Sequence, residues 1–284
     1  MPKQLILSIA LQCSILTGFC KEIPAFSNPE MADTSITPIY TIKPSVDIPL
    51  IGAGAAWDLY GFSQIGKKDG TSPEKIASLK ISDINWFDRW AVHPYSKHVD
   101  NLSYMPFYVA MPLPLAVFGL DSRMRKDFWK LTFLYGEAMV LTGVLYTSAV
   151  HYASRLRPLV YEATSPMETR ISSNSRNSFF AGHVALVGTS VFFIARVYAD
   201  YHPESHIKWV FYGGASVLTG LTAYWRNRAG EHFPSDIALG TAIGVASGLL
   251  TPTLHRTKLI RNQRLSILPF TSSGSQGLAV LYKL

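Results

Sequence analysis

A series of long apolar stretches constrains this chain more than any other feature of its sequence. Each approaches the roughly 20 residues that an α-helix needs to cross the hydrocarbon core of a bilayer. The pattern predicts an all-α fold, a bundle of about five to six membrane-length helices. A buried helical bundle in a soluble protein is the alternative. The five main stretches are Tyr104–Leu120, Phe128–Val150, Phe179–Tyr198, Val210–Tyr224 and Ile237–Leu250.

Details within the stretches indicate how the helices pack. Pro112 and Pro114 should kink the first stretch. The last two stretches are short and rich in glycine and other small residues, which suits close helix packing. An earlier stretch, Ile48–Ile65, is also apolar but contains Asp58 and three glycines. Whether this earlier stretch crosses the membrane is left open by the sequence.

The charges distinguish between two classes of partner. Hydrophobic residues make up 48% of the chain and charged residues only 16%, which is low for a soluble protein. The net charge is +7, and the basic residues cluster in short loops between apolar stretches. This arrangement fits anionic lipid head groups better than nucleic acid. We therefore expect membrane lipids as neighbours and no nucleic-acid partner.

The same charges orient the bundle. Asp121–Lys130 and His255–Arg264 each carry four basic residues, which places both loops on the cytoplasmic side by the positive-inside tendency. If the spans alternate in direction, the loops Arg155–Ser178 and Trp225–Asp236 lie together on the opposite side. The polar residues of these two loops can then share a single site.

The chain divides into four parts by composition. Residues 1–27 have a basic start, an apolar run and small residues at Ala25 and Ser27, as in a secretory signal peptide, with an uncleaved N-terminal anchor as the alternative. Residues 28–103 read as an extended arm with interfacial helices, 104–253 as the helical core, and 254–284 as a basic tail. The tail alternates apolar and polar residues around a glycine-rich turn, which predicts a short β-hairpin.

The stretch from Arg226 to Asp236 carries the first chemical motif. An arginine precedes His232 by six residues, and an aspartate follows it by four. An imidazole attacks phosphorus when one ring nitrogen is unprotonated, and a carboxylate on the other N–H fixes that tautomer. A guanidinium can hold two phosphate oxygens at once. The simpler interpretation is a polar loop before a helix that has Pro234 in its first turn.

Two further motifs favour the chemical interpretation. Gly182 and His183 open one apolar stretch, and Arg157-Pro158 closes another. Arg-Pro, then Gly-His, then Arg-x5-His-x3-Asp, each at a helix end, resembles the type 2 phosphatidic acid phosphatase (PAP2) superfamily. That family includes membrane lipid phosphatases, soluble acid phosphatases and vanadium haloperoxidases. The resemblance covers roughly residues 107–253 and implies a PAP2/haloperoxidase-like bundle.

The chain departs from the family pattern at four positions. The family has Lys-x6-Arg-Pro, Pro-Ser-Gly-His and Ser-Arg-x5-His-x3-Asp. A phosphate-binding ammonium and a phosphate-binding hydroxyl are therefore missing. The lysine slot holds Val150, the proline and serine slots hold Phe180 and Ala181, and the serine before the last arginine is replaced by Trp225.

The resemblance implies a role for each matching residue. His232 is the expected nucleophile, which forms a phosphohistidine, and Asp236 orients it. His183 is the expected general acid. The expected phosphate-binding groups are Arg157, Arg226 and the backbone around Gly182, with Arg155 as a nearby supplement. This chemistry requires no metal and no cofactor.

The implied function is a metal-independent membrane phosphatase that acts on a lipid phosphate or pyrophosphate, such as lipid A, undecaprenyl pyrophosphate or phosphatidate. We expect it in a bacterial inner membrane with its site facing the periplasm. The alternatives are a soluble periplasmic acid phosphatase of the same superfamily and a catalytically impaired PAP2-like binding protein.

Overall fold

The computed structural model describes residues 38–257 and the backbone of 265–272 and 275–282. The described chain divides into two compact units, of which Ile42–Leu254 is the larger. In the smaller unit, Tyr40 pairs with Arg256, and β1 (Leu265–Ser272) runs antiparallel to β2 (Ser275–Tyr282). The signal peptide or anchor predicted at 1–27 lies outside the described residues.

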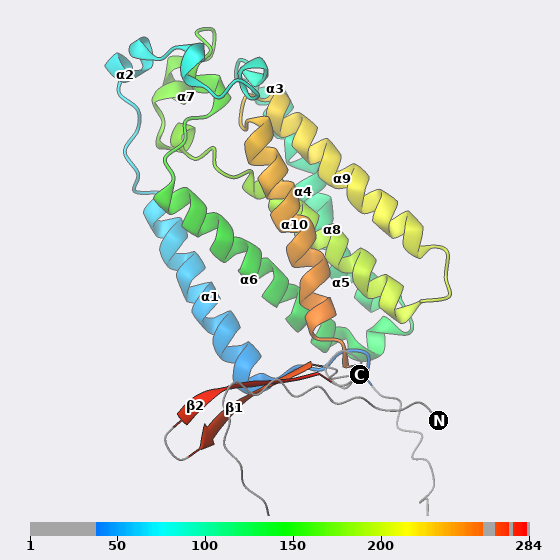
Figure 1. Ribbon diagram of the computed structural model, residues 1–284. Helices are drawn as coiled ribbons and strands as arrows, with labels where there is room; N and C mark the ends of the chain where they lie inside the picture. The colour runs from blue at the N-terminus through cyan, green and yellow to red at the C-terminus, as the bar shows by residue number, and fades with distance from the viewer. Residues whose placement is uncertain (1–37, 258–264, 273–274, 283–284) are drawn as a thin grey trace, which may run out of the picture. The chain divides into compact units, whose positions relative to one another are not determined.

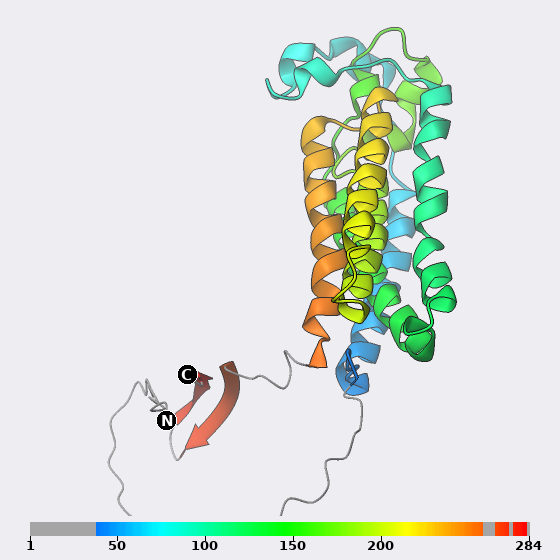
Figure 2. The ribbon, with the colours of Figure 1, turned by 90° about the vertical axis from the view of Figure 1, so that its right-hand side faces the viewer.

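The larger unit is built of helices, as the apolar stretches predict. Its long helices run side by side, and the short helices α2, α3 and α7 gather at one end of them (Figures 1 and 2). The helices are α1 (Pro44–Ile65), α2 (Pro73–Ser78), α3 (Lys97–Ser103), α4 (Met105–Ala110), α5 (Leu113–Leu120), α6 (Phe128–Tyr152), α7 (Met167–Ile171), α8 (Gly182–Tyr201), α9 (Lys208–Arg228) and α10 (Pro234–Leu254).

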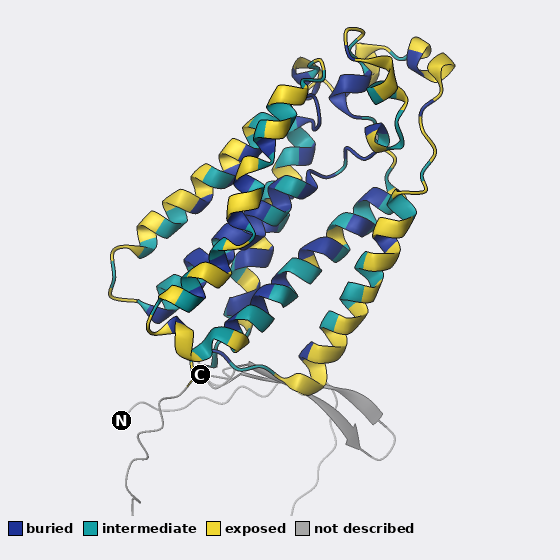
Figure 3. Cartoon of the chain, turned by 180° about the vertical axis from the view of Figure 1, so that it is seen from behind, coloured by how far each residue is buried: buried dark blue, intermediate teal, exposed yellow. Residues whose placement is uncertain are grey.

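Four helical segments among the described residues are long and apolar enough to cross a membrane: Lys97–Leu120, Met124–Tyr152, Gly182–Tyr201 and Pro234–Leu254. The predicted stretch Val210–Tyr224 lies in α9, which has 21 residues but falls outside this set. Glycines, threonines and basic end residues lower its hydropathy. Exposed residues line the outer faces of the helices, and buried ones gather where helices meet (Figure 3).

The first predicted span is interrupted where its prolines lie. The α4 helix ends at Ala110, and α5 begins at Leu113, directly after Pro112. A proline lacks the N–H that would continue the helical hydrogen bonding. The helix is therefore interrupted where the kink is predicted, and the interruption divides the segment that runs on from α3.

The early apolar stretch Ile48–Ile65 forms most of α1, which packs along α6. The indole Nε1 of Trp57 donates to the hydroxyl of Ser148 at 2.9 Å, and the Thr147 hydroxyl donates to the Asp58 carboxylate at 3.2 Å. The acid thus faces a helix neighbour rather than the outside of the bundle. Gly143 provides the room, because a Cβ there would lie 2.3 Å from an Asp58 carboxylate oxygen.

The closest packing joins α8 and α10. A Cβ at Gly240, Gly244 or Gly248 would lie 2.4–2.6 Å from a carbonyl oxygen of α8, so only glycine fits at these three positions. Their spacing of four residues puts them on one face of α10. At the end of this contact, the amide of Ala181 donates to the carbonyl of Asp236 at 3.1 Å. The packing therefore fixes the start of α8 beside the start of α10.

We expect Gly244→Ala to destabilise the bundle by about 1–3 kcal/mol, because the added methyl group overpacks a contact with backbone atoms. Gly213→Ala is the matched control, since α9 leaves open space around Gly213 and both changes raise helix propensity equally. Thermal unfolding of detergent-solubilised protein measures both. Equal melting temperatures for the two variants would contradict this packing argument.

Candidate active site

The three motifs meet at one end of the helical unit. Arg157 follows the end of α6, His183 lies in the first turn of α8, Arg226 lies in the last turn of α9, and His232 precedes α10. Two helices end here and two begin here (Figure 1). The loop arrangement expected from alternating directions is thus present in the fold.

A glycine turn brings the last motif against the first. Gly230 has φ +74, and a Cβ there would lie 2.6 Å from the carbonyl oxygen of His93. Its own carbonyl accepts the amide of Leu159 at 2.9 Å. A residue with a side chain is strained in this backbone conformation and has no room. Gly230 therefore holds the loop before His232 against the segment that carries Arg157.

The two motif arginines are buried and share an acidic partner. Arg226 is 1% exposed and Arg157 is 5% exposed. Both guanidinium groups contact the same carboxylate oxygen of Glu231, Arg226 at 2.7 Å. Arg226 also donates to Asp100 at 2.6 Å, and Arg157 donates to Asn174 at 3.1 Å. The carboxylate offsets the repulsion between two cations that are packed together without water.

Each arginine retains an unused donor. Among the described residues, the buried Nε of Arg157 and that of Arg226 have no hydrogen-bond partner. Burial, together with the charge of Arg226, lowers the pKa of Arg157 to about 10. The guanidinium still remains charged at neutral pH. Unsatisfied buried donors on two adjacent cations are the features that an anionic ligand would satisfy.

His232 is held in one tautomer. Its ring is 1% exposed, and Nδ1 donates to the carbonyl of Ser178 at 2.7 Å. A carbonyl can only accept, so Nδ1 carries the proton of the neutral ring and Nε2 offers a lone pair. Burial and then the charges of Arg226 and Arg157 hold the pKa of His232 well below its usual 6.5. The ring is therefore neutral, as a nucleophile requires.

The geometry corrects the expected role of Asp236. Its carboxylate does not bond to His232; it accepts the Ser178 hydroxyl at 2.6 Å and the amide of Phe233 at 3.1 Å. As the third residue of α10, it reaches back to the amide before the helix, as in a capping box. Asp236 thus positions Ser178, whose carbonyl in turn orients His232.

Arg155 is also placed differently from the expectation. Its guanidinium pairs with Asp88 at 2.7 Å and with Asp236, donates to Ser235 at 2.8 Å, and lies 4.6 Å from the ring centre of Phe233. Both terminal nitrogens are therefore engaged by neighbouring acids. The structure favours a role in holding the α10 loop over direct contact with phosphate.

His183 and Gly182 open α8 among aromatic rings. The imidazole packs edge-on against Tyr104 at 4.8 Å and Phe107 at 5.4 Å between ring centroids. A Cβ at Gly182 would lie 2.5 Å from the ring of Tyr146, so the glycine lets the start of the helix approach that ring.

The position that holds lysine in the family pattern is buried in this chain. Val150 is fully buried. Its carbonyl accepts a hydrogen bond from the ammonium of Lys68, which also donates to the Asn177 side chain at 3.2 Å. Burial, followed by the charge of Arg176, lowers the pKa of Lys68. This lysine caps the end of α6 from a different segment, and its bonds to neutral oxygens hold it there.

Sequence reasoning missed three acids of this region. Glu231 directly precedes His232, and its place inside a cationic motif was an available signal. Asp88 and Asp100 come from the segment before α4, which carries no motif, and only the tertiary structure brings them to Arg155 and Arg226.

Comparison with known families agrees with this geometry. Residues 131–260 match the family model of the PAP2 superfamily. This part of the chain belongs to the PAP2 superfamily. The matched range contains all three motifs, and so the PAP2 bundle comprises α6, α8, α9 and α10 with their connecting loops. Neither a curated protein nor a solved structure matches the chain.

Glu231 offers a direct test of anion binding at the PAP2 site. Glu231→Gln removes the negative charge between the two arginines and keeps the shape of the side chain. We expect inorganic phosphate to bind about tenfold more tightly, which corresponds to about 1.4 kcal/mol. Isothermal titration calorimetry of detergent-solubilised protein measures the affinity.

The matched control is Glu204→Gln, which removes an exposed acid that pairs with Arg123 at 2.9 Å. That change should leave phosphate affinity unaltered. Weaker phosphate binding in Glu231→Gln would show that the carboxylate serves to hold the arginines in place and does not compete with the anion.

Proposed function

We propose that this chain is a membrane phosphatase that hydrolyses a lipid phosphate or pyrophosphate through a phosphohistidine intermediate. The observation that carries the proposal is the pair of buried arginines with unused Nε donors beside a neutral, oriented His232. Membership of the PAP2 superfamily and four helices able to span a membrane support it.

In the first step, Nε2 of His232 attacks phosphorus while the bond from phosphorus to the leaving oxygen breaks. His183 gives its proton to that oxygen, so the alcohol or phosphate leaves in protonated form. Arg157 and Arg226 stabilise the negative charge on the phosphoryl oxygens. The amides at the start of α8 add to this, because the N-terminus of a helix attracts anions.

In the second step, water attacks the phosphohistidine, and the bond between phosphorus and Nε2 breaks. His183 now accepts a proton from the water, which restores both histidines and releases phosphate. The lysine and serine that the family pattern contains are absent. Loss of one preorganised donor typically lowers the rate by about 10²–10³-fold, which reduces such catalysis without abolishing it.

A lipid substrate is supported by the surroundings of the site. Val150 and Ala181 replace polar residues of the family pattern and are fully buried. The helices below the site expose large apolar side chains, among them Leu145 on α6 and Leu221 on α9. A lipid phosphate can enter such a site sideways from a bilayer. Lipid A, undecaprenyl pyrophosphate and phosphatidate are the candidate classes.

The proposed location is a bacterial inner membrane with the site facing the periplasm. The basic residues Arg123, Arg125 and Lys126 lie between α5 and α6, at the opposite end of the bundle from the motifs (Figure 1). By the positive-inside tendency, that end faces the cytoplasm.

The buried Glu231 and the missing lysine favour a second candidate, a PAP2-like protein that binds a phosphorylated lipid without hydrolysing it. The arginines would serve both functions, whereas His232 is needed only by the enzyme. Replacement of His232 therefore distinguishes the enzyme from the binding protein.

We expect purified protein to release phosphate from at least one lipid phosphate in mixed micelles, and His232→Ala to lower the rate by on the order of 10³-fold or more. His206→Ala, an exposed histidine outside the site, is the matched control and should keep full activity. Lipid binding without phosphate release in wild type would favour the binding protein. Full activity in His232→Ala would refute the phosphohistidine.

The pH dependence supplies an independent prediction. The pKa of His232 is lowered, so its neutral form persists as pH falls below 6.5, and the acid limb that reflects its protonation should lie well below 6.5. A profile of kcat/KM against pH for a monophosphate lipid measures this limb. An acid limb near 6.5 in the wild-type profile would contradict the lowered pKa of His232.

A further inference from the structure

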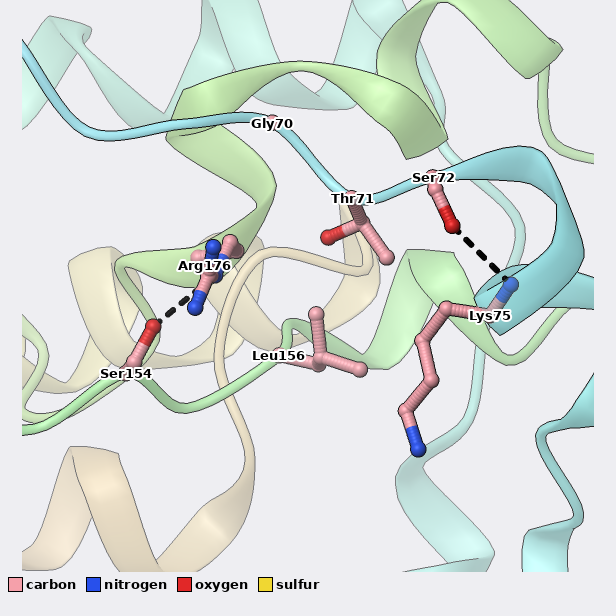
Figure 4. A pocket seen from close by; sticks show the side chains of 7 residues that line it. All are labelled: Gly70, Thr71, Ser72, Lys75, Ser154, Leu156 and Arg176. Carbon is pink, nitrogen blue, oxygen red and sulfur yellow. Dashed lines mark hydrogen bonds between the residues drawn. The ribbon is translucent and has the colours of Figure 1, made fainter.

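A second polar pocket lies beside the proposed active site. Its volume is about 250 Å³, and it lies between the segment that leads into α2 and the loop after α6 (Figure 4). It is lined by Gly70, Thr71, Ser72, Lys75, Ser154, Leu156 and Arg176. Ser154 and Leu156 occupy unspecified positions of the first PAP2 motif, and the other lining residues lie outside the three motifs.

Thr71 carries an unsatisfied polar atom into this pocket. The residue is 8% exposed, and its hydroxyl has no hydrogen-bond partner among the described residues. Figure 4 shows the Thr71 side chain projecting from the loop before α2 towards Leu156. A buried hydroxyl without a partner costs about 1–3 kcal/mol. A ligand that accepts or donates a hydrogen bond would remove this cost.

Two cations on the pocket wall are available to an anion. Arg176 is held by neutral oxygens, the Ser154 hydroxyl at 2.9 Å and the carbonyl of Asp69 at 3.2 Å, and it forms no ion pair with an acid among the residues that the structure describes. Lys75 is exposed, and within the described part of the chain its ammonium forms no ion pair. A guanidinium, an ammonium and a hydroxyl around a small pocket are suited to a phosphoryl group.

The wall of the pocket is the back of the loop that carries Arg155 and Arg157. Arg155 forms a bridge with Asn177, so this segment is extended and successive side chains point to opposite sides. Ser154 and Leu156 line the pocket, whereas Arg155 and Arg157 face the α10 loop and the site. This single segment separates the pocket from the proposed active site.

We propose that this pocket binds a second, non-reacting phosphoryl group, which selects substrates whose two phosphates are far enough apart to lie on either side of this segment. The selection of substrates rests on the proposed function, because it requires that the chain hydrolyses lipid phosphates. The affinity of the pocket for a phosphoryl group can be measured without hydrolysis. The phosphoryl group comes either from the head group of a lipid or from free inorganic phosphate, and the chemistry of recognition is shared.

Two conservative substitutions test the proposal. Thr71→Val keeps the shape and removes a hydroxyl that has no protein partner, so the free protein should be as stable as wild type or more stable. Lys75→Gln removes an exposed charge. Lys67→Gln is the matched control, because Lys67 is also exposed and does not line the pocket. The substrates are a lipid with two phosphate groups and the same lipid with one.

We expect Thr71→Val and Lys75→Gln each to raise KM for the two-phosphate lipid about tenfold, with kcat unchanged and with no effect on the one-phosphate lipid. Lys67→Gln should change neither. Equal effects on both lipids, or no effect, would overturn the proposal. Calorimetric titration with inorganic phosphate identifies the source: a second phosphate site in wild type that Thr71→Val removes assigns the pocket to free phosphate.

Binding measurements separate this proposal from the proposed function. Affinities of His232→Ala for both lipids, with and without Thr71→Val, are measured by calorimetry in detergent. A preference for the two-phosphate lipid that Thr71→Val abolishes would support the pocket even if wild type hydrolyses neither lipid. Identical affinities for the two lipids in the protein with Thr71 intact would refute it even if wild type hydrolyses both.

Discussion

The backbone contact between α8 and α10 is the constraint on which the rest of the site depends. Three glycines, Gly240, Gly244 and Gly248, let α10 approach the carbonyl oxygens of α8 too closely for any Cβ. In a membrane, helices gain little from hiding apolar surface, so such close van der Waals contact drives their association. Because the contact reaches the first turns of both helices, it also fixes the distance between His183 and the loop of His232.

Interactions between charged groups determine the structure at the end of the bundle where α8 and α10 begin. Arg157 and Arg226 are buried together, which is unfavourable unless a negative charge lies between them. Glu231 supplies that charge in the structure, and a phosphoryl group would supply it in a complex. The same cations keep His232 neutral. One arrangement therefore keeps the proposed nucleophile neutral and forms the proposed anion site, and both depend on burial.

A second layer of residues supports the catalytic groups. Asp236 and Arg155, expected to contact His232 and phosphate, instead hold Ser178 and the start of α10. The ring of His232 is oriented by a backbone carbonyl, which Asp236 positions through the hydroxyl of the same serine. The proposed anion pocket shares its wall with this layer, so the proposed substrate selection and the proposed catalysis both depend on one extended segment.

The sequence by itself determined the helical bundle, the break at Pro112, the close packing of the glycine-rich stretch in α10 and the family, because apolar length, proline and short motifs act locally. The close packing also predicted for Val210–Tyr224 is wrong, since the α9 glycines face open space. It also identified the residues that meet at the site, since each lies at a helix end. Only the tertiary structure decided the partners of those residues. The arginines pair with Asp88, Asp100 and Glu231 because folding places these acids within hydrogen-bond distance. Spacing along the chain does not encode that distance.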